Sequence, residues 1–147
     1  MKISDFLAPG DAAIDVRASS KRQLLEELSA WAGRSLASPK EPIFSTLMKR
    51  EELGSTGMGG GFALPHARLA IVKKPFGLCV RLKRLLDFDA IDGEPVDLVF
   101  LLLLPASAES EQLPALASVA RTLRAPDRLA QLRRARNALE LYEFIVN

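Results

Sequence analysis

The chain is poor in the residues that build disulfides and metal centres. Among its 147 residues it has one cysteine, Cys79, and one histidine, His66. A lone cysteine excludes a disulfide within the chain, and neither residue has the partner ligands of a multi-ligand metal site. The sequence therefore predicts a protein that binds no metal and is located in a reducing compartment.

Long apolar runs are scarce as well. The longest, Leu98–Leu104, has seven residues, whereas a helix that spans a bilayer needs about 20. The first residues also lack the apolar stretch of a secretory signal. We expect a cytoplasmic protein with no direct membrane insertion.

Neither sign of charge is in large excess. Lysine and arginine total 20 against 18 aspartates and glutamates, which gives a net charge of +2. So small a surplus does not indicate a partner made of nucleic acid or a membrane surface. With 48% hydrophobic residues the chain can form a core, and its length suits one globular domain over residues 1–147.

Helical patterns occupy both ends of the chain. Ser20 is a capping residue before an amphipathic stripe from Leu24 to Ala32, and a second helical pattern begins near Pro39 and stops at Gly54. The last third predicts two or three more helices. Their apolar stripes are Leu113, Leu116, Ala120 and Leu123, then Leu129 and Leu132, then Leu141, Tyr142 and Ile145.

Between these patterns lie candidate strands. Residues 76–82 alternate apolar and polar side chains, as a half-exposed strand does. Residues 96–104 are almost wholly apolar, which suits a central strand covered on both faces. Residues 55–61 are predicted to be neither regular helix nor a good strand. This order of elements predicts an α/β fold with helix layers on a mostly buried sheet.

The histidine stands in an unusual context. Pro65 stiffens the approach to His66, and the glycines at 57 and 59–61 permit a loop whose N–H groups bind an anion. Arg50 lies 16 residues upstream of His66, near the end of the second helical pattern. A guanidinium, backbone donors and an imidazole together suit phosphoryl transfer. The alternative is ordinary surface roles for both side chains.

Nucleotide binding fits the glycine segment poorly. Phe62 stands where the pattern GxGxxG requires its last glycine, and no Gly-Lys-Ser/Thr follows. No nucleotide or other cofactor is therefore expected.

Two blocks of sequence carry a resemblance to a known family. Residues 50–66, REELGSTGMGGGFALPH, and residues 88–98, FDAIDGEPVDL, are similar to blocks of the phosphotransferase-system enzyme IIA domains of the fructose/mannitol class. The sequence of residues 53–57, LGSTG, is most similar to that of the nitrogen-regulatory members. The resemblance covers essentially the whole chain.

The resemblance implies a fold, a reaction and partners. The family fold is a three-layer αβα sandwich around a mixed sheet in a single domain. His66 matches the histidine that accepts a phosphoryl group, on Nε2, from a phosphocarrier protein of the HPr type. Arg50 matches the arginine that stabilises the phosphate. Implied downstream partners are regulatory proteins such as potassium transporters or sensor kinases. The backbone donors expected around the phosphate belong to Thr56, Gly57, Gly59, Gly60 and Gly61.

One position departs from the family pattern. Members usually carry a second histidine after the buried strand, and here the matching place holds Gln112. We hypothesise that the amide of Gln112 donates a hydrogen bond to the phosphoryl group. A neutral amide is a weaker substitute for an imidazole, so the lifetime of the phosphate and the rate of transfer are the properties affected.

Three other functions stay open at this stage. The chain could be a sugar-specific IIA component that passes phosphate to a IIB domain, or a non-phosphorylated adaptor that keeps only the fold. A hydrolase with His66 as general base fits less well, because no nucleophile and carboxylate accompany it in motif form. We also expect Met58, Phe62 and Leu64 to form an exposed apolar rim for protein docking.

Overall fold

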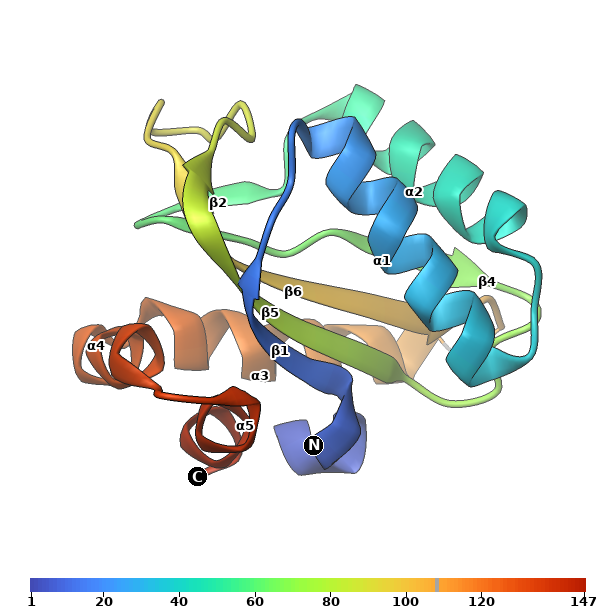
Figure 1. Ribbon diagram of the computed structural model, residues 1–147. Coiled ribbons are helices and arrows are strands. Elements are labelled where there is room, and N and C mark those ends of the chain that lie inside the picture. Colours follow the sequence, from blue (N-terminus) through green and yellow to red (C-terminus); the bar gives the residue numbers. More distant parts are fainter. Residues whose placement is uncertain (108) are drawn as a thin grey trace.

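The structure, a computed structural model, describes residues 1–107 and 109–147, and all of their side chains except those of residues 109–112. Figure 1 shows a sheet between two layers of helices. In chain order the elements are η1 (Ile3–Asp5), η2 (Pro9–Asp11), β1 (Ala12–Val16), α1 (Lys21–Leu36), α2 (Lys40–Leu53), β2 (Gly57–Gly59), β3 (Phe62–Ala63), β4 (His66–Leu69), β5 (Phe76–Leu86), β6 (Val96–Pro105), α3 (Glu109–Arg124), α4 (Pro126–Arg134) and α5 (Ala138–Val146).

The sheet is mixed and is centred on β6. Its main path runs β1-β5-β6-β3-β2, and β4 also pairs with β6. Strand β5 is antiparallel to β6, whereas β3 and β4 run parallel to it, one after the other along the same side. Because β4 follows β3 along one edge of β6, His66 lies opposite Leu102, near the end of the sheet at which β6 finishes.

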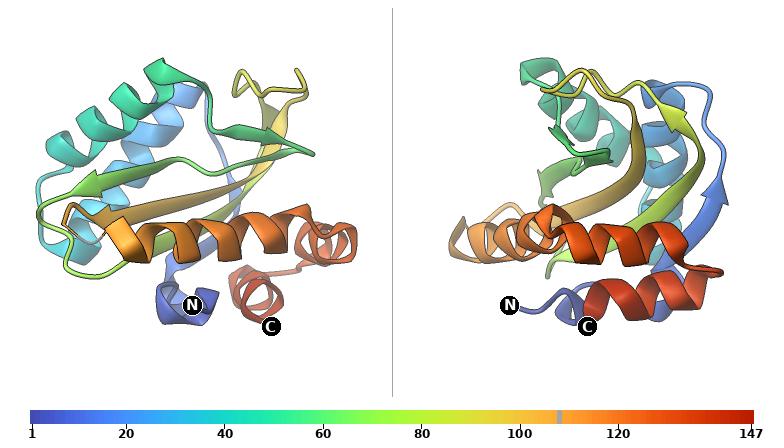
Figure 2. Two further views of the ribbon diagram at one scale, coloured as in Figure 1. Left: turned by 180° about the vertical axis from the view of Figure 1, so that it is seen from behind. Right: turned by 90° about the vertical axis from the view of Figure 1, so that its left-hand side faces the viewer.

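Helices cover both faces of the sheet. Figure 2 shows α1 and α2 on one side and α3, α4 and α5 on the other. The buried run in β6 serves both layers, since successive side chains of a strand point to opposite faces. Val99, Leu101 and Leu103 join the core under α1 and α2. Leu98, Phe100, Leu102 and Leu104 join the core under α3–α5. The predicted three-layer αβα sandwich and the two-sided central strand are confirmed.

Helix starts and stops follow the expected local signals. The Ser20 hydroxyl accepts a hydrogen bond from the Gln23 N–H at the start of α1, and Gly54 ends α2. The stripe predicted for α3 is partly wrong. Leu113 is 74% exposed, and of the described side chains on α3 those that are buried are Ala115, Ser118, Val119 and Leu123. The reason is the orientation in which α3 packs on the sheet, which local periodicity does not specify.

The prediction for residues 55–61 is wrong only at Gly57–Gly59, which form β2. Residues 57–63 form a short β-hairpin, in which β2 pairs with β3 and β3 pairs with β6. Gly60 and Gly61 make the turn with φ of 71° and 86°, a region that favours glycine. Pairing with β6 uses backbone groups alone, so weak strand propensity did not prevent it. Among the described residues no helix is both long and apolar enough to cross a bilayer.

Candidate active site

Arg50 and His66 come together because α2 packs against β4. Arg50 lies in the last turn of α2, and His66 is the first residue of β4. Both side chains line one cavity, here called the histidine hollow, with Thr56, Met58 and Leu64. Its opposite wall comes from α3, through Leu113, Leu116, Ala117 and Ala120. A second hollow shares Arg50 and His66 and is also lined by Lys49, Leu53 and Arg68.

The ring of His66 is fixed in one tautomer. Its Nδ1 lies 2.8 Å from the carbonyl oxygen of Leu64. A carbonyl can only accept a hydrogen bond, so Nδ1 carries the proton when the ring is neutral. The lone pair is then on Nε2. This arrangement leaves Nε2 as the nucleophilic atom of the only histidine in the chain.

Burial lowers the pKa of His66 below its usual value of 6.5, and the positive charge of Arg50 adds to that effect. The hydrogen bond to Leu64 and the negative charge of Glu51 act in the opposite direction on the pKa. The net lowering keeps the imidazole neutral, and hence nucleophilic, at pH 7.

This lowered pKa predicts a specific pH dependence. We expect NMR titration of His66 to give a midpoint below 6.5. Since His66 binds its proton at a higher pH in the unfolded chain than in the folded chain, its contribution to the free energy of unfolding is constant above pH 6.5 and decreases as the pH falls towards the folded midpoint. Arg50→Gln should raise the midpoint without restoring 6.5, because burial, the larger cause, remains. A native midpoint at or above 6.5 would contradict the prediction.

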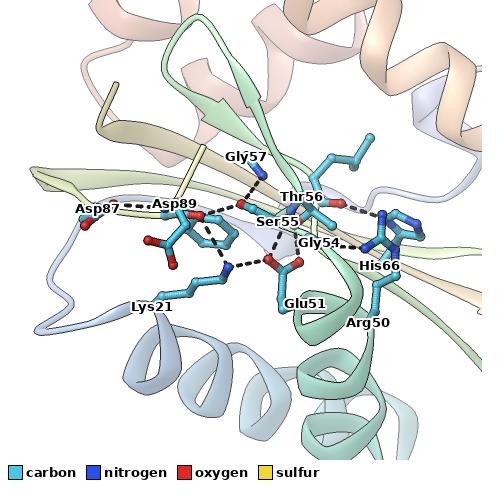
Figure 3. A network of polar contacts seen from close by, with 12 residues as sticks. Lys21, Arg50, Glu51, Gly54, Ser55, Thr56, Gly57, His66, Asp87 and Asp89 are labelled. Atoms are coloured by element: carbon cyan, nitrogen blue, oxygen red, sulfur yellow. Dashed lines mark hydrogen bonds and ion pairs between the residues drawn. The ribbon is translucent and has the colours of Figure 1, made fainter. Parts of the chain in front are cut away.

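Arg50 is anchored at the end of its own helix. Its Nη1 donates to the carbonyl oxygen of Gly54 at 2.8 Å (Figure 3). That carbonyl belongs to the segment that leaves α2 and has no helical N–H partner of its own. A guanidinium carries five N–H donors in a planar fork, so this bond leaves further donors to bind an anion beside His66.

Sequence reasoning missed a buried ion pair next to Arg50. The Glu51 carboxylate, whose side chain is 3% exposed, lies 2.7 Å from Nζ of Lys21 on α1. It also accepts hydrogen bonds from the Thr56 N–H, at 3.1 Å, and from the Thr56 hydroxyl. Lys21 in turn donates to the carbonyl of Phe88 (Figure 3). The only signal in the sequence was the position of Glu51 inside the first family block.

The predicted phosphate-binding loop is only partly at the histidine. Thr56 lines the histidine hollow, whereas Gly57, Gly59, Gly60 and Gly61 do not line it. Three of the expected N–H donors have acceptors within the protein: Thr56 donates to Glu51, Gly57 to the Ser55 hydroxyl, and Gly60 to Asp92. The side chains at the hollow, Arg50 above all, rather than a glycine nest, are therefore the candidates to hold a phosphoryl group.

The second family block packs onto the hairpin. Asp92 accepts the Gly60 N–H at 3.0 Å, and a Cβ on Gly57 would lie 2.8 Å from Ala90. At the other side of the hairpin, Arg133 of α4 donates to the Gly60 carbonyl at 2.8 Å. The glycines thus serve close packing and the turn, and the two blocks of sequence form one structural unit.

Two further expectations concern the rim of the hollow. The predicted apolar rim is wrong for Phe62 and Leu64, which are 2% and 3% exposed because both join the core under α3–α5; Met58 is half-buried. The large apolar side chains exposed at the two hollows, among the described residues, are Leu53 and Leu113. Gln112 lies on α3, and its side chain is outside the described residues.

The described residues contain no group of three or more His, Cys, Asp or Glu side chains placed to hold a metal ion. Cys79 is buried, and burial raises the pKa of its thiol to about 12. The thiol is therefore protonated at neutral pH and is no nucleophile.

Comparison with known proteins gives a consistent result. Residues 5–147 match the family described as phosphoenolpyruvate-dependent sugar phosphotransferase system, EIIA 2. The chain is 43% identical to a nitrogen regulatory protein of Bradyrhizobium diazoefficiens, over 99% of this chain and 95% of that one. A nitrogen regulatory protein of Pseudomonas aeruginosa is 38% identical, over 100% and 96%. The crystal structure of IIA-Ntr from Neisseria meningitidis superposes with a TM-score of 0.92 at 34% identity, covering 97% of this chain and 98% of that one.

Proposed function

Because the chain belongs to the EIIA 2 family of the phosphotransferase system, we propose that it accepts a phosphoryl group on Nε2 of His66 from a phosphocarrier of the HPr type. The phosphorylated and free forms then differ in their binding to regulatory partners. The resemblance to nitrogen regulatory proteins supports the regulatory role. Potassium transporters and sensor kinases are the proposed kinds of target.

The proposed reaction needs no cofactor. The lone pair on Nε2 attacks the phosphorus atom, and an N–P bond forms as the N–P bond to the donor histidine breaks. The bonding pair leaves with the donor nitrogen, so nothing is oxidised or reduced. Nδ1 keeps its proton, and the hydrogen bond to Leu64 stabilises the positive charge that develops on the ring. Arg50 neutralises charge on the phosphoryl oxygens.

The observation that carries this proposal is the pairing of a fixed tautomer with an adjacent guanidinium. The bond from Nδ1 to Leu64 selects Nε2, and Arg50 lines the same hollow. A general base for hydrolysis would need a partner nucleophile in place. Direct attack by Nε2 needs only position and charge, which these two side chains supply.

The experiment that tests the function uses the native chain with a phosphocarrier labelled with ³²P. The expected product carries label that is lost in acid and survives in base, as an N–P bond does, and mass spectrometry places it on His66. Unlabelled protein, with a carrier that is active on another IIA protein, would contradict the proposal and favour the non-phosphorylated adaptor.

The sugar-specific alternative has its own test. The phosphorylated chain is mixed with purified IIB domains of the fructose and mannitol types. A regulator is expected to keep its phosphoryl group over the time in which a sugar-specific IIA passes it on. Rapid transfer to either IIB domain would favour the transport role.

Two exposed leucines are expected to contact the carrier. Leu53 is 86% and Leu113 is 74% exposed, and each lines a hollow that contains His66. Their position beside the reactive histidine, rather than their exposure alone, makes them the side chains we expect a docking partner to cover. We expect Leu53→Ser or Leu113→Ser to raise KM for the phosphocarrier about 5-fold with little change in kcat, as loss of a moderate interface contact does.

Ile91 is the matched control for this prediction. It is 88% exposed and lies between β5 and β6, outside both hollows. Ile91→Ser should leave KM unchanged. An equal effect of all three substitutions would show a general loss of apolar surface rather than docking at the hollow.

A further inference from the structure

We propose that Glu51 is a positioning residue for His66, acting through Thr56 and Leu64. This inference rests on the proposed function of His66 as phosphoryl acceptor. It adds to that function a chain of contacts that begins at Lys21 of α1 and passes through Glu51 of α2 to His66 (Figure 3).

The first link is the buried ion pair. Lys21 of α1 lies 2.7 Å from the carboxylate of Glu51 in the last turn of α2. Lys21 is further fixed by the Phe88 carbonyl and by the ring of Phe88, whose centroid is 4.7 Å from Nζ. A carboxylate this deeply buried needs its charge and its lone pairs satisfied, so its position is tightly determined.

The second link joins Glu51 to the segment before the hairpin. Both of its carboxylate oxygens are used by Thr56, one by the backbone N–H at 3.1 Å and the other by the hydroxyl. Thr56 is itself buried, with 2% of its surface exposed. These two bonds set the place at which the chain leaves α2 and enters β2.

The third link reaches the histidine. The carbonyl of Thr56 accepts the Leu64 N–H at 2.9 Å, and the carbonyl of Leu64 is 2.8 Å from Nδ1 of His66. Glu51 thus positions Thr56, and Thr56 in turn holds Leu64, whose carbonyl oxygen selects the tautomer. A shift of Thr56 moves Leu64, and the bond that places the lone pair on Nε2 weakens.

The charged groups around His66 affect its pKa, so a substitution at Glu51 can act on His66 through charge as well as through position. From α2 the charged neighbours are Lys49, Arg50 and Glu51, and from β4 there is Arg68. The described α3 side chains at the hollow are apolar. Of the two charged side chains whose effects are resolved, Arg50 lowers and Glu51 raises the pKa of His66. Two substitutions at residue 51 can therefore separate the effect of its charge on the pKa of His66 from its effect on the position of Thr56.

Glu51→Asp keeps the charge and shortens the side chain, so the carboxylate can stay near Lys21 but withdraws from Thr56. Glu51→Gln keeps the length and an oxygen acceptor for the Thr56 N–H but loses the charge. Glu52→Asp is the matched control, since Glu52 is the next residue on α2 and is exposed. All are made in the full chain.

Long-range ¹H–¹⁵N spectra of the single histidine report the tautomer and the titration midpoint. We expect Glu51→Asp to give a mixture of tautomers in place of the Nδ1–H form, and phosphoryl transfer to slow about 10-fold, as loss of an indirect orienting contact does. Glu51→Gln should keep the native tautomer and lower the midpoint. Glu52→Asp should match the native chain in all three measurements.

A folded Glu51→Asp protein with the native tautomer and the native transfer rate would overturn the positioning role. Unfolding in urea, measured in parallel, identifies any variant that has lost its fold. If instead the proposed function is wrong, the native chain accepts no phosphoryl group. The spectra of the His66 ring then still show whether Glu51 controls the tautomer.

Discussion

His66→Ala is expected to abolish phosphorylation by the carrier completely. The chain has one imidazole. The hydrogen bond from its Nδ1 to the Leu64 carbonyl leaves the lone pair on Nε2. Alanine has no atom that can form the N–P bond. The measurement is incorporation of ³²P from the labelled carrier, which we expect to be one phosphoryl group per native chain, matching its single histidine, and none in the variant.

The control for this experiment is the fold of the variant. Removing the ring leaves the Leu64 carbonyl without its donor, and because this hydrogen bond is part-buried the cost is at most about 1–3 kcal/mol. The variant should therefore unfold at a lower urea concentration and still be folded in buffer. Label on a folded His66→Ala protein would place the phosphoryl group elsewhere. Label that survives acid would point to a hydroxyl such as that of Ser55 or Thr56.

Arg50→Gln is expected to slow phosphoryl transfer to His66 about 100-fold, the usual cost of removing one preorganised donor to a developing negative charge. Glutamine removes the positive charge beside His66 and the planar fork of donors. The transfer rate of Arg50→Lys should lie between that of the native chain and that of Arg50→Gln, because lysine keeps the positive charge but lacks the planar fork of donors. Rapid-quench measurement of label transfer gives the rate of the chemical step, separate from binding of the carrier.

Lys49→Gln is the matched control for Arg50. It removes one positive charge at the neighbouring position on α2, from an exposed side chain that lines the second hollow only. Its effect is expected to be small and to vanish at higher salt, because exposed charges are screened. If Lys49→Gln slowed transfer as much as Arg50→Gln at high salt, general electrostatic attraction of the carrier would replace the direct role of Arg50.

The ends of the helices and the central strands could be predicted from the sequence. The cap at Ser20 and the stop at Gly54 depend on backbone groups within one helical turn, so a few neighbouring residues specify them. The uninterrupted apolar run of β6 indicates burial on both faces, and in the structure its side chains pack under α1 and α2 on one face and under α3–α5 on the other. Family resemblance then pointed to Arg50 and His66 without any knowledge of their distance.

The short strands were beyond this reasoning. β1 and β4 have 5 and 4 residues, too few for a periodic pattern to stand out. The hairpin of β2 and β3 is rich in glycine, whose strand propensity is low. These segments become strands because β5 and β6 offer them backbone partners, and such pairing depends on residues distant in the sequence.

By itself the sequence determined the layered α/β fold, the helices that bound it and the two side chains proposed to handle the phosphoryl group. Local periodicity and capping carry the information on the helices and the central strands, whereas the roles of the two side chains came from the resemblance of residues 50–66 to a known family. Only the tertiary structure decided that Glu51 is buried against Lys21, that Leu113 is exposed, and that the Leu64 carbonyl meets His66. Each of these depends on how α1, α2 and α3 pack on the sheet, and that packing joins residues whose separation along the chain leaves no local signal.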